Sequence, residues 1–438
     1  MFPASPAAAR TPPFADVIAS AAGVVAGVID GRTPDAAISA LNDAVRPAVA
    51  DLALNTLRDF GRGDFLLARL LARPLRAGDA ARTRQLRALL LCALHRLEAR
   101  PQAAHTIVDQ SVAAGRRLIG TQTAPLVNGV LRSFLRERAA LLAAADGDAV
   151  ARWRHPAWWL AQLQADHAHE WQAIAAAGNT HPPMSLRLNG RRPATTVVSP
   201  ALSALPHRVL PGGAWLLDTP MPVARLPGFA DGACSVQDAG AQLAAPLLDV
   251  RDGMRVLDAC AAPGGKTAHL LESAAIDLLA LELDGGRAER VRANLARLGL
   301  TADVRVADAR DPDTWWDGRP FERILADVPC SASGVVRRHP DAKWLRRAAD
   351  IDAFADTQRQ IIDALWRTLA PDGKMLYATC SVFARENSQQ VAAFLARHAD
   401  ARLEPLQPPG SPIIATELQL LPTAEHDGFF YALLAKQP

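Results

Sequence analysis

Two cysteines of this 438-residue chain stand in sequence contexts that suit nucleophilic chemistry. Cys330 lies in the run DVPCS, which begins at Asp327, and Cys380 lies in the run TCS. Each cysteine is followed by serine, and each comes shortly after a hydrophobic segment with the character of a strand. A thiolate is a strong nucleophile at neutral pH when its pKa is lowered. One cysteine at a strand end is more often a core residue, but two in matching positions favour a chemical role.

A loop that contains a glycine pair lies upstream of both cysteines, after a hydrophobic segment that ends at Asp258. The glycines let the backbone approach a ligand closely, and the following helix offers free N–H groups at its N-terminus. The spacing fits neither G-x-G-x-x-G nor G-x-x-x-x-G-K-[ST], so neither a dinucleotide nor ATP is the expected ligand. We expect Asp258 to anchor the loop. The residues assigned to cofactor binding here are Cys260, Ala261, Ala262, Pro263, Gly264, Gly265 and Lys266.

Acidic residues end the next two hydrophobic segments, Glu282 at one and Asp308 at the other. A carboxylate at the position of Glu282 can accept hydrogen bonds from two ribose hydroxyls, and Asp308 is placed to reach an adenine. Alone, each residue would more often be a solvated helix cap. Because they follow successive strands of one predicted sheet, together they favour a cofactor that carries a nucleoside.

These residues fall in a region, residues 238–438, where predicted strands alternate with predicted helices. Such alternation is typical of a parallel sheet covered by helices on both faces. Ligands of open α/β sheets bind beyond the carboxyl ends of the strands, where the strand order reverses. The predicted strands are residues 255–259, 278–283, 303–307, 323–328, 374–379 and 429–434, and the clearest predicted helices are residues 287–298 and 352–369.

Two further domains are predicted before this one. Residues 1–145 are rich in Ala, Leu and Arg, and the apolar stripe between Leu86 and Leu97 has helical spacing. Turn signals divide this region into about six helices, which predicts an all-α bundle. Residues 146–237 contain one clear predicted strand, residues 185–189, among many prolines, which indicates a small α/β connector.

Composition and charge restrict the class of protein. Hydrophobic residues make up 50% and charged residues 21% of the chain, as in ordinary globular proteins. The first apolar run is too short to span a bilayer and Asp16 stands where a signal peptide carries positive charge, so we expect a cytoplasmic protein. Five cysteines without metal-ligand spacing argue against a disulfide framework or a structural metal. Residues 1–145 carry 18 Arg and Lys against 11 Asp and Glu, a net +7 that fits either nucleic acid or solvated helix faces.

Three motifs carry a specific resemblance to a known family. DACAAPGGKTAHL, LADVPCSASGVVRRHPDAKWLRR and LYATCSVFARENS, preceded by SVQD, resemble the Sun/Fmu-type RNA cytosine-C5 methyltransferases of bacteria, within the wider NOP/Sun family. RWRHPAWWL and PPMSLRLN resemble the family's intermediate module, and the helical region resembles its NusB-like RNA-binding domain. The resemblance implies a class I-like, Rossmann-type methyltransferase fold for residues 238–438.

The resemblance also implies the cofactor, S-adenosyl-L-methionine, and the methyl acceptor, C5 of a cytosine. Family enzymes add a thiolate to C6, so that C5 becomes electron-rich enough to take the methyl group. By resemblance, Cys380 attacks C6 and Cys330 assists breakdown of the covalent adduct. Asp327 is expected to hydrogen-bond the base near N3 and to touch the cofactor. Glu282 departs from the family pattern, where aspartate is more usual, which keeps the carboxylate but changes its reach to the ribose.

The expected partner is small-subunit (16S) ribosomal RNA, and the chain is expected to act as a monomer without membrane or metal. Because a duplex hides C5 and C6 in the base stack, the target cytosine must be unpaired or flipped outward. The cluster Arg337-Arg338-His339, after the Cys330 loop, is predicted to hold RNA backbone beside the reaction.

Three alternative functions stay open. The same chemistry acts on tRNA in one of them, although a NusB-like domain favours ribosomal RNA. A non-catalytic NusB-like RNA-binding assembly factor is the second, disfavoured by the intact glycine loop and both cysteines. The third is a DNA cytosine methyltransferase in which Cys330 attacks, disfavoured by the second cysteine and the helical domain.

Overall fold

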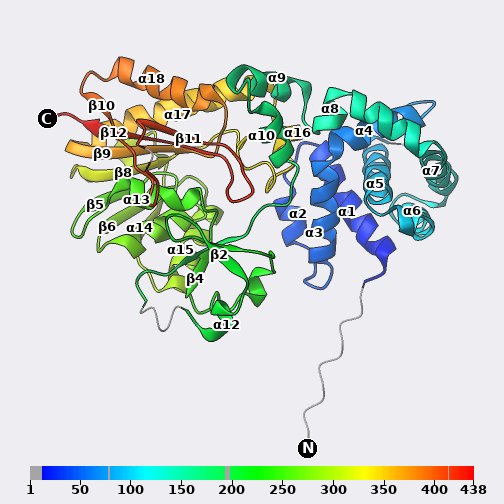
Figure 1. Cartoon of the computed structure of the whole chain (residues 1–438), viewed down its shortest axis with the longest axis horizontal. Coiled ribbons are helices and arrows are strands. Elements are labelled where there is room, and N and C mark those ends of the chain that lie inside the picture. Colours follow the sequence, from blue (N-terminus) through cyan, green and yellow to red (C-terminus); the bar gives the residue numbers. More distant parts are fainter. Residues whose placement is uncertain (1–11, 77–78, 193–197, 413) are drawn as a thin grey trace, which may run out of the picture. The chain divides into compact units, whose positions relative to one another are not determined.

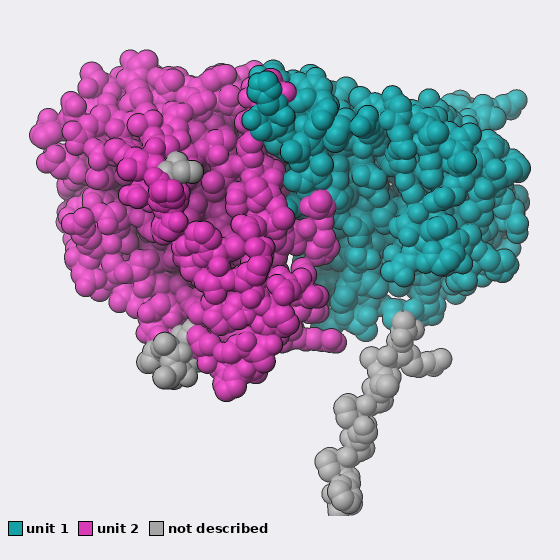
Figure 2. Space-filling view, in the orientation of Figure 1, with its two compact units in different colours: residues 1–165, 169–179, 336–347 teal, residues 166–168, 180–335, 348–438 magenta. Residues whose placement is uncertain are grey.

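The structure is a computed structural model, and it describes residues 12–76, 79–192, 198–412 and 414–438. The chain forms two compact units (Figure 2). Unit 1 contains residues 1–165, 169–179 and 336–347, and unit 2 contains residues 166–168, 180–335 and 348–438. The boundaries of the two units differ from those of the three predicted domains. Residues 146–165 and 169–179, predicted in the connector, belong to unit 1 with the helical region. The small sheet of the connector belongs to unit 2 with the large C-terminal sheet.

Unit 1 is helical in its described residues, as the apolar periodicity predicts. Its central helix α5 contains the run of buried leucines and contacts α1, α3, α4, α6 and α7. Asp79 caps α5, since its side chain accepts a hydrogen bond from the backbone N–H of Arg82. The helices are α1 (Phe14–Ile29), α2 (Asp35–Ser39), α3 (Arg46–Arg58), α4 (Phe60–Leu70), α5 (Ala80–Ala99), α6 (Ala104–Leu118), α7 (Ala124–Gly147), α8 (Ala149–Trp153), α9 (Ala157–Asp166), α10 (Trp171–Ala177) and α16 (Ala342–Leu345).

The segment 336–347 belongs to unit 1 although it follows the Cys330 loop in the chain. Trp344 packs its ring against Phe60, with the ring centroids 5.0 Å apart, and its indole N–H donates to the carbonyl oxygen of Leu57 at 2.8 Å. The Lys343 ammonium is buried and donates to Asn179 Oδ1 at 2.9 Å. These contacts explain why the segment clusters with helices that lie far away in the sequence.

Unit 2 contains a small antiparallel sheet with the strand order β2-β3-β1-β4. Its strands are β1 (Ser185–Leu188), β2 (His207–Val209), β3 (Trp215–Leu217) and β4 (Cys234–Val236), and the short helix α12 (Pro200–Ser203) precedes β2. The strand predicted at residues 185–189 is therefore present as β1. The other strands have three residues each, too short for an alternating pattern to mark them in the sequence.

The large sheet of unit 2 has the order β10-β12-β9-β8-β5-β6-β7, with β11 paired to β12. β5 to β9 run parallel, whereas β12 is antiparallel to β9, β10 and β11. The sheet is thus mixed where a parallel sheet was predicted, because β12 follows two further strands rather than a crossover helix. The strands are β5 (Arg255–Asp258), β6 (Asp277–Glu282), β7 (Asp303–Val306), β8 (Phe321–Asp327), β9 (Leu369–Thr379), β10 (Ala401–Glu404), β11 (Glu417–Leu420) and β12 (Phe429–Lys436).

Helices cover both faces of the large sheet (Figure 1). Alternate residues of β5 point to opposite faces, with Val256 in the core under α13–α15 and Leu257 in the core under α17 and α18. The chain winds β5, β6 and β7 to one side and then returns to β8 and β9 on the other, so the order reverses between β5 and β8. The helices are α13 (Ala244–Leu248), α14 (Gly265–Ser273), α15 (Gly285–Leu298), α17 (Ala348–Thr368) and α18 (Ser388–Arg397). No helix in the described part of the chain is long and apolar enough to cross a membrane.

Candidate active site

The carboxyl ends of β5, β6, β8 and β9 bring the predicted site residues to one edge of the sheet. β5 ends at Asp258, β6 at Glu282 and β8 at Asp327, and the two cysteines follow β8 and β9 within a few residues. Parallel neighbours end at the same edge, which is why residues far apart in the sequence meet here.

The two predicted thiols are in contact. Cys330 Sγ lies 3.3 Å from Cys380 Sγ, and the backbone N–H of Gly334 donates to the carbonyl oxygen of Cys380 at 2.9 Å. Cys330 is only 9% exposed, whereas Cys380 is half-buried. The hydrogen bond with Cys380, followed by burial, raises the pKa of Cys330 well above its ordinary value. The arrangement therefore holds Cys330 as a neutral thiol beside a more accessible Cys380.

Lys266, predicted as part of the glycine loop, forms an ion pair with Asp327 at the end of β8. Its Nζ donates to Asp327 Oδ2 at 2.6 Å, and both side chains are largely buried. Burial opposes the charge on Lys266, but the Asp327 carboxylate outweighs it and raises the pKa of Lys266. The ion pair places a charged hydrogen-bonding group at the end of β8, the strand that precedes Cys330. The spacing of the sequence motifs did not predict this pairing.

Asp258 and the glycine loop interlock as the sequence suggested. Asp258 Oδ2 accepts a hydrogen bond from Thr267 Oγ1 at 2.6 Å, so it bonds to the first turn of α14. Burial raises the pKa of Asp258 to about 7. Gly264 has φ +93°, a left-handed conformation that favours glycine, and a Cβ there would lie only 3.2 Å from the Val291 Cα. The loop is thus held close against the sheet and against α15.

The two predicted nucleoside-binding carboxylates differ in their surroundings. Glu282 is buried and accepts backbone N–H groups from Ala262 at 3.3 Å and Asp284 at 3.1 Å. Asp308 is partly exposed and pairs with Arg310 at 2.6 Å, and this hydrogen bond lowers the pKa of Asp308. Both lie after neighbouring parallel strands, so the structure places them on the β6–β7 side of the edge.

Two groups at this edge were missed by sequence reasoning. Arg187 on β1 is buried, makes two hydrogen bonds to the Glu272 carboxylate, and donates to the carbonyl oxygen of Gly265 at 2.8 Å. Glu386, after β9, is fully buried and bonds to the serines that follow both cysteines. Its only sequence signal is an acidic residue just downstream of the TCS motif, inside a buried stretch.

The RNA clamp predicted from Arg337 is wrong for that residue. Its side chain is 2% exposed and packed in unit 1, where its carbonyl oxygen accepts from Arg58 at 2.7 Å. Arg338 is half-buried and His339 is exposed. A run of basic residues indicates charge but not which side chains point outward, and here Arg337 is anchored by the packing of the whole segment.

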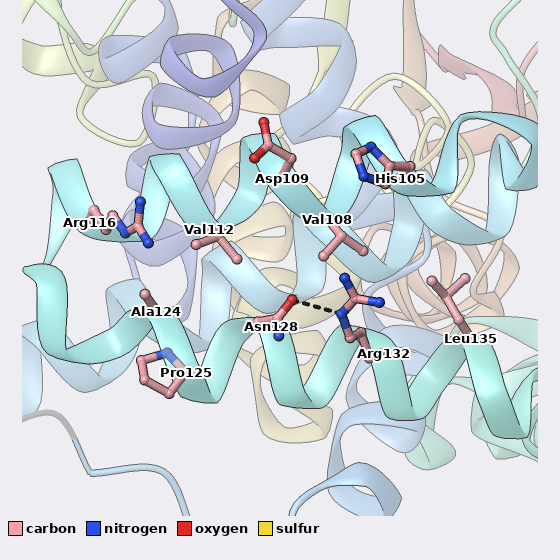
Figure 3. A pocket seen from close by; sticks show the side chains of 10 residues that line it. All are labelled: His105, Val108, Asp109, Val112, Arg116, Ala124, Pro125, Asn128, Arg132 and Leu135. Atoms are coloured by element: carbon pink, nitrogen blue, oxygen red, sulfur yellow. Dashed lines mark hydrogen bonds between the residues drawn. The ribbon is translucent and has the colours of Figure 1, made fainter.

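A cavity of about 550 Å³ lies between α6 and α7 of unit 1 (Figure 3). Arg116, Arg132 and His105 line it together with the apolar side chains of Val108 and Val112. Asp109 also lines it, so the lining combines basic, acidic and apolar side chains. Among the described residues no group of three or more His, Cys, Asp and Glu could hold a metal ion.

Family models match three successive parts of the chain. The model described as "16S rRNA methyltransferase RsmB/F" matches residues 245–435. A model for the "Methyltr_RsmF/B-like, ferredoxin-like domain" matches residues 155–221, and the NusB family model matches residues 25–136. The predicted NusB-like helical domain and C-terminal Rossmann-type methyltransferase domain are confirmed, and the connector is of the ferredoxin-like type.

Solved structures share the fold. The protein of the crystal structure titled PH0851 superimposes with a TM-score of 0.79 at 22% identity, covering 97% of this chain and 99% of its own. A methyltransferase homolog protein from Pyrococcus horikoshii gives a TM-score of 0.57 at 24% identity, covering 66% of this chain and 97% of its own. At these identities the likeness shows the fold alone.

Curated relatives match nearly from end to end. The ribosomal RNA small subunit methyltransferase B of Pseudomonas putida is 42% identical over 436 residues, which cover 95% of this chain and 98% of that protein. The protein of the same name from Vibrio cholerae is 41% identical and covers 96% of this chain and 98% of its own. Identity of this order over nearly the full length of both relatives places the chain in the family of the ribosomal RNA small subunit methyltransferase B proteins.

Proposed function

We propose that this chain transfers a methyl group from S-adenosylmethionine to C5 of a cytosine in small-subunit ribosomal RNA, as its relatives' name indicates for the RNA. The observation that carries the proposal is the contact between Cys330 and Cys380 at the ends of neighbouring parallel strands. A nitrogen or oxygen acceptor needs no thiol for methylation, whereas an unreactive ring carbon is activated by covalent addition of a nucleophile.

Cys380 is the proposed nucleophile. It is the more accessible of the two thiols, and the contact with Cys380 together with burial keeps Cys330 in the neutral form. Addition of the Cys380 thiolate to C6 moves electron density to C5. Asp327 contacts the base near N3, and the Lys266 ammonium holds the Asp327 carboxylate in place by the 2.6 Å ion pair.

The β5–β7 side of the edge fits the cofactor, which supplies an electrophilic methyl group when bound. Glu282 offers a buried carboxylate for ribose hydroxyls, and Asp308 offers an acceptor farther along the edge for the adenine. The loop 259–267 brings backbone close, because Gly264 keeps it free of side-chain bulk. These residue types match a ligand with a diol and an amino-bearing base.

Breakdown of the adduct completes the reaction. A water molecule takes the C5 proton, the C5–H electron pair re-forms the C5–C6 double bond, and the bond between Cys380 Sγ and C6 breaks, which releases 5-methylcytosine and the Cys380 thiolate. Cys330 assists this step, because its Sγ lies 3.3 Å from the sulfur that must depart. Removal of Cys330 therefore leaves addition possible and breakdown impaired.

The helical unit supplies the proposed RNA-binding surface. Its first 145 residues carry a net +7, and the cavity of Figure 3 is lined by Arg116 of α6 and Arg132 of α7. Arginines on a helical surface bind phosphates without reading sequence. This supports ribosomal RNA as a large substrate that contacts more than the reaction site.

Bisulfite mapping of ribosomal RNA tests the proposal. A strain deleted for the gene should lose methylation at one or more cytosines of the small-subunit RNA, and the wild-type gene should restore it. A gene that encodes Cys380→Ala should fail to restore it. Retention of every 5-methylcytosine in the deletion strain would refute the ribosomal assignment, and loss confined to tRNA would replace it with the tRNA alternative.

A further inference from the structure

The buried carboxylate of Glu386 bonds to both loops that carry the thiols, the one after β8 and the one after β9. Glu386 ends the short 3-10 turn Ala384–Glu386 after β9, and its side chain is fully buried. Its Oε1 accepts the backbone N–H of Ser331 at 2.7 Å, and its Oε2 accepts the hydroxyls of Ser331 and Ser381 at 2.6 Å each. Ser331 follows Cys330 and Ser381 follows Cys380, so one side chain holds the residue next to each sulfur.

The bonds around this carboxylate form a closed network. Ser381 Oγ lies 2.9 Å from Ser333 Oγ, which accepts the backbone N–H of Val382 at 2.9 Å. Gln358 Nε2 donates to the carbonyl oxygen of Pro329 at 3.0 Å, and the Tyr377 hydroxyl donates to the carbonyl oxygen of Glu386 at 2.5 Å. The network thus holds residues on both sides of Cys330 and the chain that follows Cys380.

Joining two loops through a buried carboxylate has a desolvation cost in free energy. Burial raises the pKa of Glu386, and the serine hydrogen bonds work in the opposite direction. An apolar contact of the same volume would join the loops without that desolvation cost. Hydrogen bonds fix direction as well as proximity, however, and two sulfurs that act on one base need a fixed mutual position.

We propose that Glu386 is a positioning residue that holds Cys330 and Cys380 in register for the two halves of the covalent reaction. The inference rests on the proposed function for its consequence, since register matters because Cys380 attacks and Cys330 assists departure. Its structural content, that the carboxylate fixes the sulfur–sulfur distance, does not depend on methyl transfer.

A trivalent arsenical tests the structural content without RNA or cofactor. Phenylarsine oxide condenses with two neighbouring thiols, forming two As–S bonds and releasing one water, and Cys330 and Cys380 at 3.3 Å suit this capture. The wild-type chain should gain one arsenical that neither Cys330→Ala nor Cys380→Ala retains. Glu386→Ala should capture it roughly tenfold more slowly, because bridging requires both sulfurs in a fixed geometry.

The reaction itself supplies the second readout. In the Cys330→Ala background, where adduct accumulates, Glu386→Ala should slow adduct formation on the order of 100-fold, with the Kd for S-adenosylmethionine within about twofold of its value in that background, since Glu386 binds no cofactor. Gln390→Ala is the matched control, because Gln390 is buried and polar but bonds to the carbonyl oxygen of Ala355 instead. It should lower Tm without slowing capture or adduct formation.

Glu386→Gln separates position from charge. Its amide keeps one acceptor for Ser331 N–H and can donate to the two hydroxyls, so it should restore most of the capture rate. The proposal would be overturned if folded Glu386→Ala captured the arsenical at the wild-type rate. Equal decreases of the capture rate in Glu386→Ala and Glu386→Gln would also overturn it. If Glu386→Ala does not fold, the double variant Ser331→Ala/Ser381→Ala decides in its place by the same two rates. Normal arsenical results with no methylation by the wild type would overturn the proposed function while leaving the register role intact.

Discussion

The two halves of the sheet edge are built differently. On the β6–β7 side the two candidate carboxylates are each paired with an arginine and share no bond with each other, and their side-chain exposure rises from 5% at Glu282 to 33% at Asp308. On the β8–β9 side the two thiol loops are joined through buried serines and the Glu386 carboxylate. In the proposed function, a diffusible nucleoside completes the hydrogen bonds of the first side when it binds, whereas the second side holds its two sulfurs in place before the substrate arrives.

The difference shows where a substitution acts on binding and where it acts on chemistry. A change on the β6–β7 side removes one contact to a ligand and leaves the rest of the edge intact. A change on the β8–β9 side removes a reacting atom or its support. Loss of a reacting atom should therefore have the larger effects, and loss of an exposed carboxylate the smallest.

The two thiols should give the largest and most distinct effects. Cys380→Ala removes the nucleophile, so methylation should be abolished and no covalent complex should form. Cys330→Ala leaves addition possible but impairs departure, so a protein–RNA adduct should persist through denaturing electrophoresis. Incubation of each variant with RNA and S-adenosylmethionine, followed by denaturing gels, measures both outcomes.

The opposite pattern would exchange the roles. An adduct with Cys380→Ala and none with Cys330→Ala would make Cys330 the nucleophile, as in the DNA-type mechanism. Normal methylation by both variants would rule out thiol chemistry at this edge altogether.

Lys266 should come next in size. Lys266→Met removes the ammonium from the 2.6 Å pair and leaves Asp327 without it in a largely buried position. Loss of a hydrogen bond between charged groups is worth about 1.5 to 3 kcal/mol, so kcat should fall roughly 10- to 100-fold. Steady-state kinetics measures this, and Lys436→Met is a control, since Lys436 bonds to backbone carbonyl oxygens of Trp366 and Leu369.

The pH profile adds an independent check on Lys266. The Asp327 carboxylate raises the pKa of Lys266 above its ordinary value, so the ammonium persists at alkaline pH. Activity should therefore show no loss from deprotonation of this group up to about pH 10. A wild-type kcat profile that falls near pH 8, with the fall absent from Lys266→Met, would contradict the ion pair.

Glu282→Ala should act on the cofactor alone. Loss of the carboxylate should weaken S-adenosylmethionine binding by about 1 to 3 kcal/mol, because the ribose hydroxyls lose their acceptor in a buried position. RNA affinity should not change. Isothermal titration with the cofactor measures the effect, and an unchanged dissociation constant would remove Glu282 from the cofactor site.

Much of this edge could be predicted from the chain itself. The strands that carry the site have apolar centres and are followed by chemistry-bearing residues, so the sequence alone predicts Asp258, Glu282 and both cysteines at strand ends. Residues that act through tertiary contacts could not be placed in this way. Arg187 reaches Gly265 across 78 positions of sequence, and Glu386 reaches Ser331 across 55.

The misplaced features have physical causes. Arg337 lies in a basic run that is typical of an RNA contact. In the structure its segment, with Lys343 and Trp344, packs into unit 1, and local sequence composition does not predict such tertiary packing. β12 was predicted as a strand of a parallel sheet but runs antiparallel to β9, because strand direction depends on the connection that precedes the strand. The length of 387–428 allows two short strands there, β10 and β11, that carry no strong alternation.

Asp308 should give the smallest effect and so mark the outer limit of the cofactor side. Its side chain is 33% exposed and already paired with Arg310, so solvent screens its interaction with a ligand. Asp308→Ala should weaken S-adenosylmethionine binding by less than about 1 kcal/mol, and Asp308→Asn by less still, because the amide keeps an acceptor for the adenine. Titrations of both variants beside Glu282→Ala measure the order. Equal losses of binding free energy in Asp308→Ala and Glu282→Ala would contradict this order. They would mean that the exposure of a carboxylate in the free protein does not set its contribution to cofactor binding, and that the bound cofactor buries Asp308 as fully as Glu282.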